Sequence, residues 1–487
     1  MKILKDILFG VSVNKVYGTT DVSINDLIFD SRKVNDNSLF IAQKGVLVDG
    51  HKFIDKAINL GAIAIICEEI PSNLNKGITY VQVDDSNKAL AIIASNFYEN
   101  PSKQTQLVGI TGTNGKTTIA TLLYNLFKKE GYKVGLLSTV KIMVDETEYV
   151  ATHTTPDSVS INHYLHLMVC AGVEYCFMEV SSHGIHQKRT DGLCFAGGIF
   201  TNLSHDHLDY HNSFAEYRDV KKSFFDNLPK TAFALVNADD KNGTVMLQNT
   251  KAKKVTYALK SLADYKAKIL ESRFSGLLLN IDGSEVWVKL IGGFNAYNLL
   301  AIYGAADLLG MEKMESLRLL SELENVSGRF EYFISNGGIT TIVDYAHTPD
   351  ALKNVLETIN SIRTGNEKVI TVMGCGGDRD KTKRPKMGFI ASILSTQAIF
   401  TSDNPRTENA QTIIDEIEQG VSPESYSKTL SILDREQAIK TAVKLANKGD
   451  ILLIAGKGHE SYQEINGVRS EFDDYKKAQL ILKELQK

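Results

Sequence analysis

A glycine-rich loop between an apolar strand and an amphipathic helix constrains this chain more than any other feature. Residues 107–118 read Leu-Val-Gly-Ile-Thr-Gly-Thr-Asn-Gly-Lys-Thr-Thr, and the apolar residues that follow share one helical face: Ile119, Leu122, Leu123, Leu126 and Phe127. Gly131 can end this helix. Backbone N–H groups of such a loop point at an anion, where a helix N-terminus, a lysine ammonium and a hydroxyl for Mg²⁺ also meet. The segment therefore predicts a strand, a phosphate loop and a helix that bind ATP with Mg²⁺.

The glycine spacing departs from the standard phosphate loop. That pattern requires glycine five residues before Gly115, where this chain has Ile110. The spacing found here, G-x-x-G-x-x-G-K-T-T, resembles the loop of the Mur ligases and the folylpolyglutamate synthetases, which activate a carboxylate with ATP and join it to an amine. The resemblance implies that ATP is bound by Gly112, Thr113, Asn114, Gly115, Lys116, Thr117 and Thr118.

Length and composition limit the remaining possibilities. A chain of 487 residues is too long for one core, and about 150 residues per domain suggests three domains. The net charge of −4 with scattered lysines gives no basic stripe, so we expect no nucleic-acid partner. Asp6 interrupts any apolar leader, and no segment approaches the length of a membrane span. We expect a cytoplasmic monomer whose partners are small-molecule substrates.

The cysteines are odd in number and lack paired metal-binding spacing. Four of the five lie inside apolar or helical runs, which predicts buried, reduced thiols. The five are Cys67, Cys170, Cys176, Cys194 and Cys375.

Residues 1–100 are predicted to form a first α/β domain. A helix through Ala57, a turn at Gly61 and a buried strand at 64–66 follow from the pattern. Asp30-Ser31-Arg32 is, from the sequence alone, a polar turn. In the Mur ligases that add the third peptide residue, a turn of this kind holds the uridine nucleotide. The resemblance thus implies a UDP-binding domain with Ser31 in its site, ending at a linker near Asn100.

Two polar segments follow apolar strands in the predicted central domain, residues 101–330. Residues 175–178 run into Glu179-Val180-Ser181-Ser182-His183-Gly184, and residues 198–202 run into a histidine-rich segment, 203–211. Ligands gather at the carboxyl ends of parallel strands, so Glu179 is a candidate Mg²⁺ ligand. The histidine run resembles binuclear metal hydrolases only superficially, because Tyr210 stands where they require histidine. An enzyme that binds a nucleoside triphosphate with Mg²⁺ also needs only one or two protein oxygen ligands for the metal.

Both segments are similar to signatures of the Mur ligase central domain. The resemblance implies that Glu179 and His207 bind Mg²⁺ alongside Thr117, and that the muramyl dipeptide substrate contacts Thr154, Thr155, Ser181, Gln187 and Arg189. Helix capping is the simpler interpretation of Thr154 and Thr155. The family also uses a carbamylated lysine, whose counterpart is Lys221, with Lys222 as an alternative one residue away. The simpler interpretation of Lys221 is a solvated helix lysine.

Three further features complete the central domain. Residues 277–281 and 286–290 alternate about Asp282-Gly283 like a hairpin. Asn295 stands near the start of a helix, where asparagine commonly caps, although in the family this segment borders the adenine. Residues 327–330, which include Arg329, resemble the ATP-contacting arginine turn of the family.

Residues 331–487 are predicted to form a C-terminal, Rossmann-like α/β domain. Strands near 339–344, 369–373, 398–401 and 451–455 each run into a polar or glycine-rich loop. Dinucleotide binding is disfavoured, because no G-x-G-x-x-G follows the first strand. Each loop taken singly is weak evidence, but four loops on one sheet edge predict a site.

The loop Asp403-Asn404-Pro405-Arg406 predicts the amino-acid substrate. A bidentate arginine binds a carboxylate well, whereas lysine has no second carboxylate to offer. Family members that add meso-diaminopimelate carry this D-N-P-R motif. The resemblance implies that Arg379 and Arg406 bind the distal carboxylate, and that Gly456 and Glu460 receive the distal ammonium. A surface salt bridge is the simpler interpretation of Arg406 alone.

The resemblance as a whole implies a fold and a reaction. The fold is α/β in three domains: an N-terminal UDP-binding domain, a central P-loop parallel-sheet ATPase domain and the Rossmann-like domain. The reaction is ATP-dependent addition of meso-diaminopimelate to the D-Glu γ-carboxylate of UDP-MurNAc-L-Ala-D-Glu through an acyl phosphate, with Lys116, Glu179, His207 and Lys221 as catalytic residues. Alternatives are a lysine-adding tripeptide synthetase and a regulatory phosphate-loop ATPase.

Overall fold

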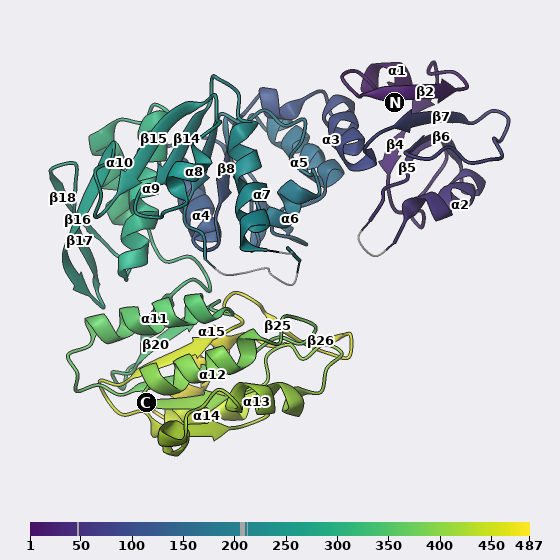
Figure 1. Cartoon of the computed structure of the whole chain (residues 1–487). Helices are drawn as coiled ribbons and strands as arrows, with labels where there is room; N and C mark the ends of the chain where they lie inside the picture. The colour runs from purple at the N-terminus through teal and green to yellow at the C-terminus, as the bar shows by residue number, and fades with distance from the viewer. Residues whose placement is uncertain (46–47, 205–209, 212) are drawn as a thin grey trace.

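The computed structural model describes residues 1–487 except 46–47, 205–209 and 212. Its three large sheets follow one another along the chain and form three α/β bodies (Figure 1). The expected α/β class and the three-body organisation are confirmed. His207 and most of the histidine run lie outside the described residues, so nothing below concerns their positions.

The first sheet has five strands in the order β2-β7-β6-β5-β4, parallel except for β2 against β7. Side chains alternate across it: Leu39 and Ile41 face the core under α3, whereas Phe40 faces the core under α2. The elements are β1 (Lys2–Ile3), α1 (Leu4–Ile7), β2 (Val13–Tyr17), β3 (Ser23–Ile24), β4 (Asp26–Ile28), β5 (Ser38–Ile41), η1 (Gly50–Phe53), α2 (Ile54–Asn59), β6 (Ala62–Cys67), β7 (Thr79–Val83) and α3 (Ser86–Phe97).

The central sheet has eleven strands in the order β11-β10-β9-β12-β8-β13-β14-β15-β16-β17-β18. The strands from β9 to β16 are parallel, and antiparallel strands extend both edges. The strands are β8 (Gln106–Thr111), β9 (Val134–Leu137), β10 (Lys141–Val144), β11 (Thr147–Val150), β12 (Tyr175–Glu179), β13 (Gly197–Phe200), β14 (Phe233–Asn237), β15 (Lys253–Ala258), β16 (Tyr265–Arg273), β17 (Gly276–Ile281) and β18 (Ser284–Val288).

Helices cover both faces of the central sheet. One core lies under α4 and α9, and Val108 and Ile110 of β8 point into it; Leu107 points into the opposite core, under α5 and α7. This explains the continuous apolar runs of these strands, which are buried on both faces. The helices are η2 (Pro101–Lys103), α4 (Lys116–Lys129), α5 (Ser158–Cys170), α6 (Ser182–His186), α7 (Phe214–Asp226), α8 (Gly243–Met246), α9 (Gly293–Leu308) and α10 (Lys313–Glu322).

The third sheet has the order β19-β20-β24-β21-β22-β23, and all its pairs except β19 with β20 are parallel. Helices α11, α12 and α13 cover one face, and α14 and α15 the other. The strands are β19 (Glu331–Ile334), β20 (Thr340–Asp344), β21 (Val369–Met373), β22 (Gln397–Phe400), β23 (Thr429–Ser431), β24 (Ile451–Ala455), β25 (Tyr462–Ile465) and β26 (Val468–Glu471); the helices are α11 (Pro349–Ile362), α12 (Lys383–Leu394), α13 (Ala410–Glu418), η3 (Pro423–Lys428), α14 (Arg435–Leu445) and α15 (Asp474–Glu484).

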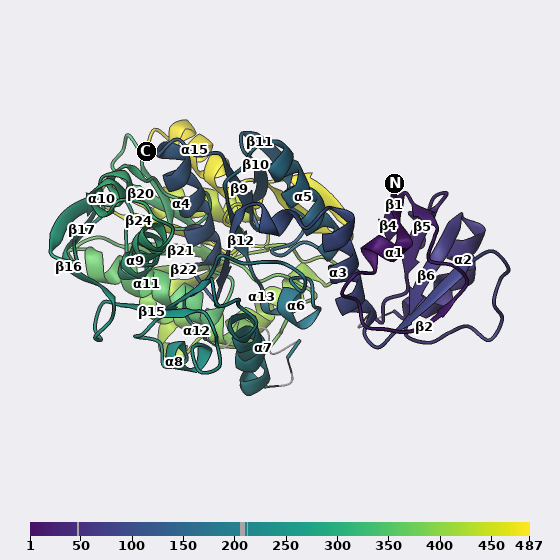
Figure 2. The ribbon, with the colours of Figure 1, turned by 90° about the horizontal axis from the view of Figure 1, so that it is seen from above.

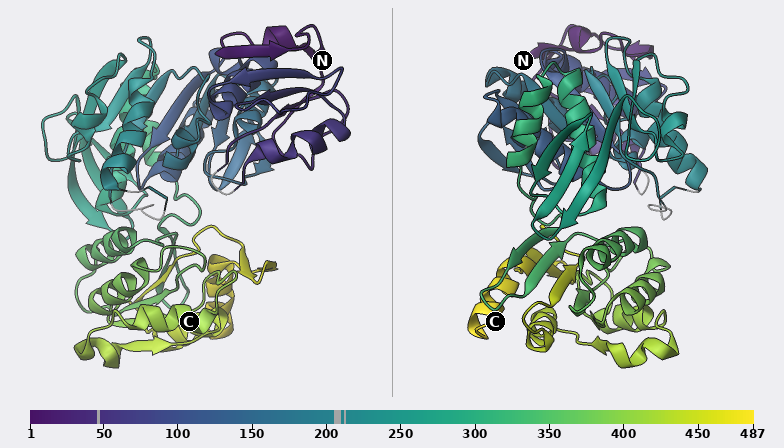
Figure 3. Two further views of the ribbon diagram at one scale, coloured as in Figure 1. Left: turned by 45° about the vertical axis from the view of Figure 1, so that its right-hand side comes forward. Right: turned by 90° about the vertical axis from the view of Figure 1, so that its left-hand side faces the viewer.

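The central body joins the other two. Helix α3 of the first body packs against α5, which leaves the first sheet at one end of the molecule when it is seen from above (Figure 2). The third body lies below the central body (Figure 3), where Phe274, from the turn between β16 and β17, and Phe294 of α9 pack against the third core. The edge that carries the phosphate loop therefore faces the third body.

The prediction of buried thiols was only partly right. All five cysteines are free, and Cys67, Cys176 and Cys375 are buried, but Cys170 is exposed and Cys194 is half-buried. Cys170 is the last residue of α5 and Cys194 lies in the loop before β13, and the apolar pattern around them did not reveal that exposure. In the part of the chain that is described, no helix is long and apolar enough to cross a membrane.

Candidate active site

The phosphate loop connects β8 to α4 as predicted, and two of its glycines are required by close packing. Gly112 has φ +147, and a Cβ there would lie 1.9 Å from Thr201 Oγ1. Gly115, with φ +89, is the N-cap of α4, and its Cβ would meet Asn298 Oδ1 at 2.7 Å. The Lys116 ammonium donates to the carbonyl oxygens of Gly112 (2.9 Å) and Thr113 (2.8 Å). The loop is therefore a compact cradle at a helix N-terminus, which favours an anion.

Thr117 and Glu179 bring two oxygen ligands together at the carboxyl ends of β8 and β12. The Thr117 hydroxyl donates to Glu179 Oε2 (3.0 Å), and the N–H of Thr139 donates to Oε1 (2.7 Å). Both side chains are buried. A hydroxyl and a carboxylate beside a phosphate cradle fit Mg²⁺, which takes few protein ligands and completes its shell with phosphate and water.

Lys221 of α7 points at the phosphate loop. Its side chain is buried, and Nζ donates to the Gly112 carbonyl oxygen at 3.0 Å and lies 4.8 Å from the centre of the Tyr217 ring. Lys222 instead pairs with Asp226, one turn along the helix. The fold thus distinguishes the two lysines that the sequence left ambiguous: Lys221 faces the candidate site, and it is not a solvated helix lysine.

The candidate dipeptide-binding residues form one hydrogen-bonded cluster. The Thr155 hydroxyl donates to the Glu179 carbonyl oxygen (2.8 Å) and accepts from the Ser181 N–H (2.9 Å). Arg189 donates to Gln187 Oε1 and to the Thr155 carbonyl oxygen. Thr154 accepts from the Thr139 hydroxyl (3.1 Å). This cluster directly adjoins Glu179, whose carboxylate accepts the hydrogen bond from Thr117.

Helix capping does not explain the two threonines. The N-cap of α5 is Asp157, whose carboxylate accepts from the Ser160 N–H, and Ser181 caps α6. Thr155 therefore ties the segment before α5 to the end of β12.

Ser31 lies in the first body, in a buried position within a closed turn. The Arg32 side chain and its N–H both bond to Asp30, and these bonds lower the pKa of Asp30 to about 2. The prediction that Asp30, Ser31 and Arg32 form a polar turn is confirmed. A role in nucleotide binding stays a prediction.

Helix α9 carries two hydrogen-bonded asparagines, one of which lies against the phosphate loop. Asn295 Nδ2 donates to the Ile291 carbonyl oxygen (2.8 Å), and its Oδ1 accepts from Asn298 Nδ2 (2.9 Å). Asn298 in turn lies against Gly115. Asn295 is not the helix cap, because Gly292 occupies that place. Asn298 was not among the predicted site residues, although the i, i+3 spacing of the two asparagines places them on one helical face.

Arg329 connects the phosphate loop to the third body. Its Nη2 donates to Thr117 Oγ1 at 3.1 Å, and its guanidinium lies 4.5 Å from the centre of the Tyr345 ring. The His459 ring packs on the same tyrosine, with centroids 5.1 Å apart. Burial and the charge of Arg329 lower the pKa of His459 to about 3, so this imidazole is neutral. Stacked side chains thus lead from Thr117 towards the loop that carries Glu460.

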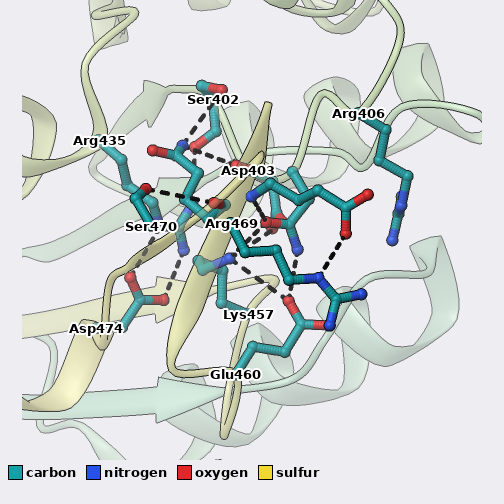
Figure 4. A network of polar contacts seen from close by, with 12 residues as sticks. Ser402, Asp403, Arg406, Arg435, Lys457, Glu460, Arg469, Ser470 and Asp474 are labelled. Carbon is teal, nitrogen blue, oxygen red and sulfur yellow. Dashed lines mark hydrogen bonds and ion pairs between the residues drawn. The ribbon is translucent and has the colours of Figure 1, made fainter. Parts of the chain in front are cut away.

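The four loops predicted on one edge of the third sheet do meet there. Figure 4 shows the cluster: Lys457 Nζ donates to Asn404 Oδ1 (3.0 Å) and lies 3.4 Å from Glu460 Oε2 and 3.9 Å from Asp403 Oδ1. Asn404 Nδ2 also donates to Glu460 (2.7 Å). Burial raises the pKa of Glu460, and the neighbouring Asp403 raises it further. Lys457, which the sequence analysis did not select, is the buried cation that holds these two carboxylates together.

Position 456 requires glycine because its backbone lies against the Asp403 side chain. It has φ +117, and a Cβ there would lie 2.5 Å from Asp403 Oδ2. The loop after β24 can therefore approach the Asp403 loop closely.

Two arginines flank Gly376 beside this cluster. A Cβ on Gly376 would lie 3.0 Å from Arg406 Nη1 and 3.9 Å from Arg379 Cγ. Arg406 donates to the Gly377 carbonyl oxygen (2.7 Å) and has φ +53. It forms no ion pair with a described residue, so the surface-salt-bridge interpretation was wrong.

The β25–β26 hairpin fixes the Arg406 backbone from both directions. Arg406 N–H donates to the Glu464 carbonyl oxygen (3.1 Å), and Asn466 N–H donates to the Arg406 carbonyl oxygen (2.7 Å). Glu464 N–H also donates to Asn404 Oδ1. A hairpin some 60 residues downstream thereby holds the loop that Pro405 already stiffens.

Comparisons with known proteins agree with this geometry. Three family models match: "Mur ligase family, catalytic domain" over residues 23–98, "Mur ligase middle domain" over 110–306 and "Mur ligase, glutamate ligase domain" over 328–458. A relative from Cytophaga hutchinsonii named "UDP-N-acetylmuramoyl-L-alanyl-D-glutamate--2,6-diaminopimelate ligase" is 56% identical over 483 residues, covering 99% of this chain and 98% of the relative. One of the same name from Clostridioides difficile is 43% identical, covering 97% of each.

Solved structures are similar as well. A structure of a protein with that name has a TM-score of 0.68 at 32% identity and covers 95% of this chain and 96% of its own. The MurF ligase from Thermotoga maritima in complex with ADP has a TM-score of 0.63 at 21% identity, covering 95% of this chain and 98% of its own, and shows the same fold.

Proposed function

The chain belongs to the Mur ligase family, and we propose that it uses ATP to join meso-diaminopimelate to the D-glutamate γ-carboxylate of UDP-MurNAc-L-Ala-D-Glu in peptidoglycan precursor synthesis. One structural observation carries the choice of amino acid. Arg379 and Arg406 flank Gly376 beside the Asn404 loop, which hydrogen-bonds to the half-buried carboxylate of Glu460. Two cations and one anion match the distal carboxylate and ammonium of diaminopimelate.

The third body receives the amino acid. Arg379 and Arg406 bind the distal carboxylate, since a guanidinium fork matches carboxylate geometry. Glu460 receives the distal ammonium with the backbone of Gly456, while Asp403, Asn404 and Pro405 keep the loop in register. Burial and the neighbouring Asp403 raise the pKa of Glu460, so a substrate ammonium beside it is favourable because it stabilises the ionised carboxylate.

The central body binds ATP and the dipeptide. The phosphate loop and Lys116 hold the triphosphate, Asn295 borders the adenine and Arg329 reaches the phosphates from the turn that leads into the third body. Thr154, Thr155, Ser181, Gln187 and Arg189 hold the dipeptide next to Glu179, and Ser31 contacts the uridine nucleotide. The cluster that these residues form around the carboxyl end of β12 supports this assignment.

The reaction brings the negative charges of the γ-carboxylate and the γ-phosphate together, and these charges must be neutralised. A γ-carboxylate oxygen attacks the γ-phosphorus and ADP leaves; the substrate amine then attacks the acyl carbon, phosphate leaves and the amine loses a proton. Lys116 lies where it can neutralise the transferring group, and positioning dominates because phosphoryl transfer requires little covalent work from side chains. Thr117, Glu179, His207 and a carbamylated Lys221 would hold Mg²⁺, which supplies Lewis-acid stabilisation of phosphate charge.

The buried lysine supports the carbamate assignment. Carbamylation would convert the cation near Gly112 into an anion that can bind a metal.

The proposal also includes the domain bounds 1–100, 101–330 and 331–487, a monomeric state and a cytoplasmic location.

An ADP-release assay tests the function. Purified chain, ATP, Mg²⁺ and UDP-MurNAc-L-Ala-D-Glu are combined with meso-diaminopimelate or with L-lysine, and the tripeptide product is identified by mass spectrometry. ADP release that requires both the dipeptide and diaminopimelate supports the proposal. Equal or faster turnover with lysine would instead assign the lysine-adding reaction, and turnover indifferent to both substrates would assign a regulatory ATPase.

A further inference from the structure

A buried ion-pair cluster adjoins the two loops that carry Arg379 and Arg406. At its centre is Arg384 of α12, whose side chain is fully buried. Its Nη2 donates to Glu408 Oε1 (2.8 Å), and its Nη1 donates to Glu408 Oε2 (3.0 Å) and to Glu416 Oε2 of α13 (2.6 Å). A buried guanidinium requires such partners, because an unpaired buried charge is strongly destabilising. The two carboxylates therefore hold Arg384 in one place.

Glu408 connects both loops to this cluster. It lies two residues after Arg406, and its Oε1 accepts from the N–H of Asp378, the residue before Arg379 (2.5 Å). The bonds from Arg384 and from the Asp378 N–H lower the pKa of Glu408 to about 2, so this carboxylate is ionised near neutral pH. One carboxylate thus holds the backbone next to Arg379 against the turn that carries Arg406.

Other hydrogen bonds join the two loops directly. Thr407 Oγ1 donates to Asp378 Oδ1 (2.7 Å), and the Thr407 N–H donates to Asp378 Oδ2 (3.2 Å). The Gly377 N–H donates to the Asn404 carbonyl oxygen (2.9 Å). Asp378 and Arg406 both have positive φ, +54 and +53, a strained conformation that persists where surrounding contacts fix the backbone. The two loops therefore form a single unit.

The helices that carry the cluster are closely packed. A Cβ on Gly388 of α12 would lie 2.0 Å from the Ile417 carbonyl oxygen of α13, and one on Gly420 would lie 1.7 Å from the Pro385 carbonyl oxygen. Closely packed interiors transmit displacements instead of absorbing them. Arg384 is therefore a rigid base for the loops that it contacts.

We propose that Glu408 is a positioning residue for the amino-acid substrate, and that with Arg384 it sets the spacing of Arg379 and Arg406 for the distal carboxylate. The inference rests on the proposed function, because it concerns the same carboxylate. Two guanidinium groups bind one carboxylate only when both are aimed at it, so a small change in the spacing of their loops weakens the binding. Glu408 acts through the two arginines and does not itself bind the substrate.

Matched variants in the ADP-release assay test this role. Glu408→Gln keeps the side-chain shape, but leaves one acceptor oxygen where the carboxylate offers two to Arg384 and the Asp378 N–H. We expect KM for diaminopimelate to rise about tenfold, within the 10²-fold that a misplacement of about 1 Å can cost. The values of kcat and of KM for ATP should change by less than about twofold, because the phosphate loop is untouched.

Glu416→Gln is the control. It removes the other carboxylate charge beside Arg384, but within the described part of the chain Glu416 has no hydrogen bond to either arginine loop. All three kinetic constants should stay within about twofold of wild type. Thermal unfolding checks that both variants are folded at the assay temperature.

A double variant separates positioning from general structural damage. Glu408→Gln added to Arg406→Ala should raise KM for diaminopimelate by less than about twofold, because no pair of guanidinium groups remains to be spaced. The loss of a merely structural contact would instead multiply KM by the same factor in both backgrounds.

Three results would overturn the inference: an unchanged KM for diaminopimelate in Glu408→Gln, equal increases in Glu408→Gln and Glu416→Gln, and the same factor with and without Arg406. If Glu408→Gln does not fold, Thr407→Val replaces it. This variant removes the exposed hydroxyl that donates to Asp378, and it must raise the same KM by at least about threefold. Wild-type ADP release that does not require diaminopimelate would overturn the proposed function, and this inference with it.

Discussion

Arg329 donates a hydrogen bond from Nη2 to Thr117 Oγ1 at 3.1 Å, across 212 positions of sequence. The same hydroxyl donates to Glu179 at 3.0 Å. A single threonine thus joins the start of α4, the carboxyl end of β12 and the turn that leads into the third body. This hydrogen bond is therefore one of the contacts through which the turn before the third body meets the phosphate loop.

Removing this hydroxyl should impair catalysis more than folding. Thr117→Val keeps the side-chain volume but leaves both Glu179 and Arg329 without their shared partner. We expect kcat/KM for ATP to fall about 10²–10³-fold in the ADP-release assay, the usual cost of losing one group that stabilises developing charge. Thr121→Val, one turn along α4, is the control, because its buried hydroxyl has no partner among the described residues. A loss in that variant as large as in Thr117→Val would contradict the assigned role.

Gly112 should not tolerate a side chain. A Cβ would lie 1.9 Å from Thr201 Oγ1, at φ +147. Gly112→Ala should therefore abolish measurable ATP binding in calorimetry. Gly131→Ala is the matched control: it also has positive φ (+102), but a Cβ there meets nothing within 4 Å. We expect that control to lose only roughly 1–2 kcal/mol of unfolding free energy and to keep its affinity for ATP.

Arg406 should determine the affinity for the amino acid. Arg406→Ala is expected to raise KM for diaminopimelate about 10–100-fold, because hydrogen bonds to charged groups contribute roughly 1.5–3 kcal/mol, and to leave KM for ATP unchanged. Arg469→Ala is the control, since its exposed side chain pairs with Glu464 on the hairpin and should change KM by less than about threefold. Similar increases in both KM values for Arg406→Ala would remove the residue from the amino-acid site.

Lys221 and Lys222 should behave differently despite being neighbours. Lys221→Ala should abolish ligase activity, and a short carboxylate such as acetate should partly restore it by replacing the carbamate. Lys222→Ala loses only its contact with Asp226 and should remain active. Full activity of Lys221→Ala would exclude the carbamate, and carbon-13 NMR of protein equilibrated with labelled bicarbonate would detect it directly.

Stability should depend on pH through Asp344. Burial raises the pKa of this carboxyl from 3.8 to about 6, against the opposing effects of Arg329 and the Phe330 N–H. The folded state therefore binds the proton more tightly than the unfolded state. This contribution is fully present below about pH 4, and is lost as the pH rises through 6.

The variant Asp344→Asn isolates that contribution. Relative to wild type, it should lose the pH-dependent component of the unfolding free energy between pH 4 and 6, at most roughly 3 kcal/mol for a pKa raised from 3.8 to about 6. Urea unfolding across this range measures it, with Asp21→Asn on the exposed surface as the control. Parallel pH profiles for wild type and Asp344→Asn would show that Asp344 titrates alike in both states.

Several local features were correctly predicted because each is specified within a few residues. The strand before Gly112, the helix after Lys116 and the positive φ of Gly131 follow from apolar periodicity and glycine geometry. The hairpin at Asp282-Gly283 has the predicted turn. The four loops of the third sheet also share an edge, because successive parallel strands end on the same side.

Contacts between distant segments could not be predicted in the same way. Nothing in the sequence near Lys221 distinguishes it from Lys222, and nothing near Lys457 indicates that it joins Asp403 to Glu460. The backbone hydrogen bonds between the β25–β26 hairpin and Arg406, and the partial exposure of Cys194, could not be predicted from the sequence either.

The sequence by itself therefore determined the α/β class, the strand, loop and helix around Lys116 and, through its motifs, the family. Only the tertiary structure decided which side chains share a site, because backbone preferences act over a few residues whereas burial and contact depend on how whole sheets and helices pack.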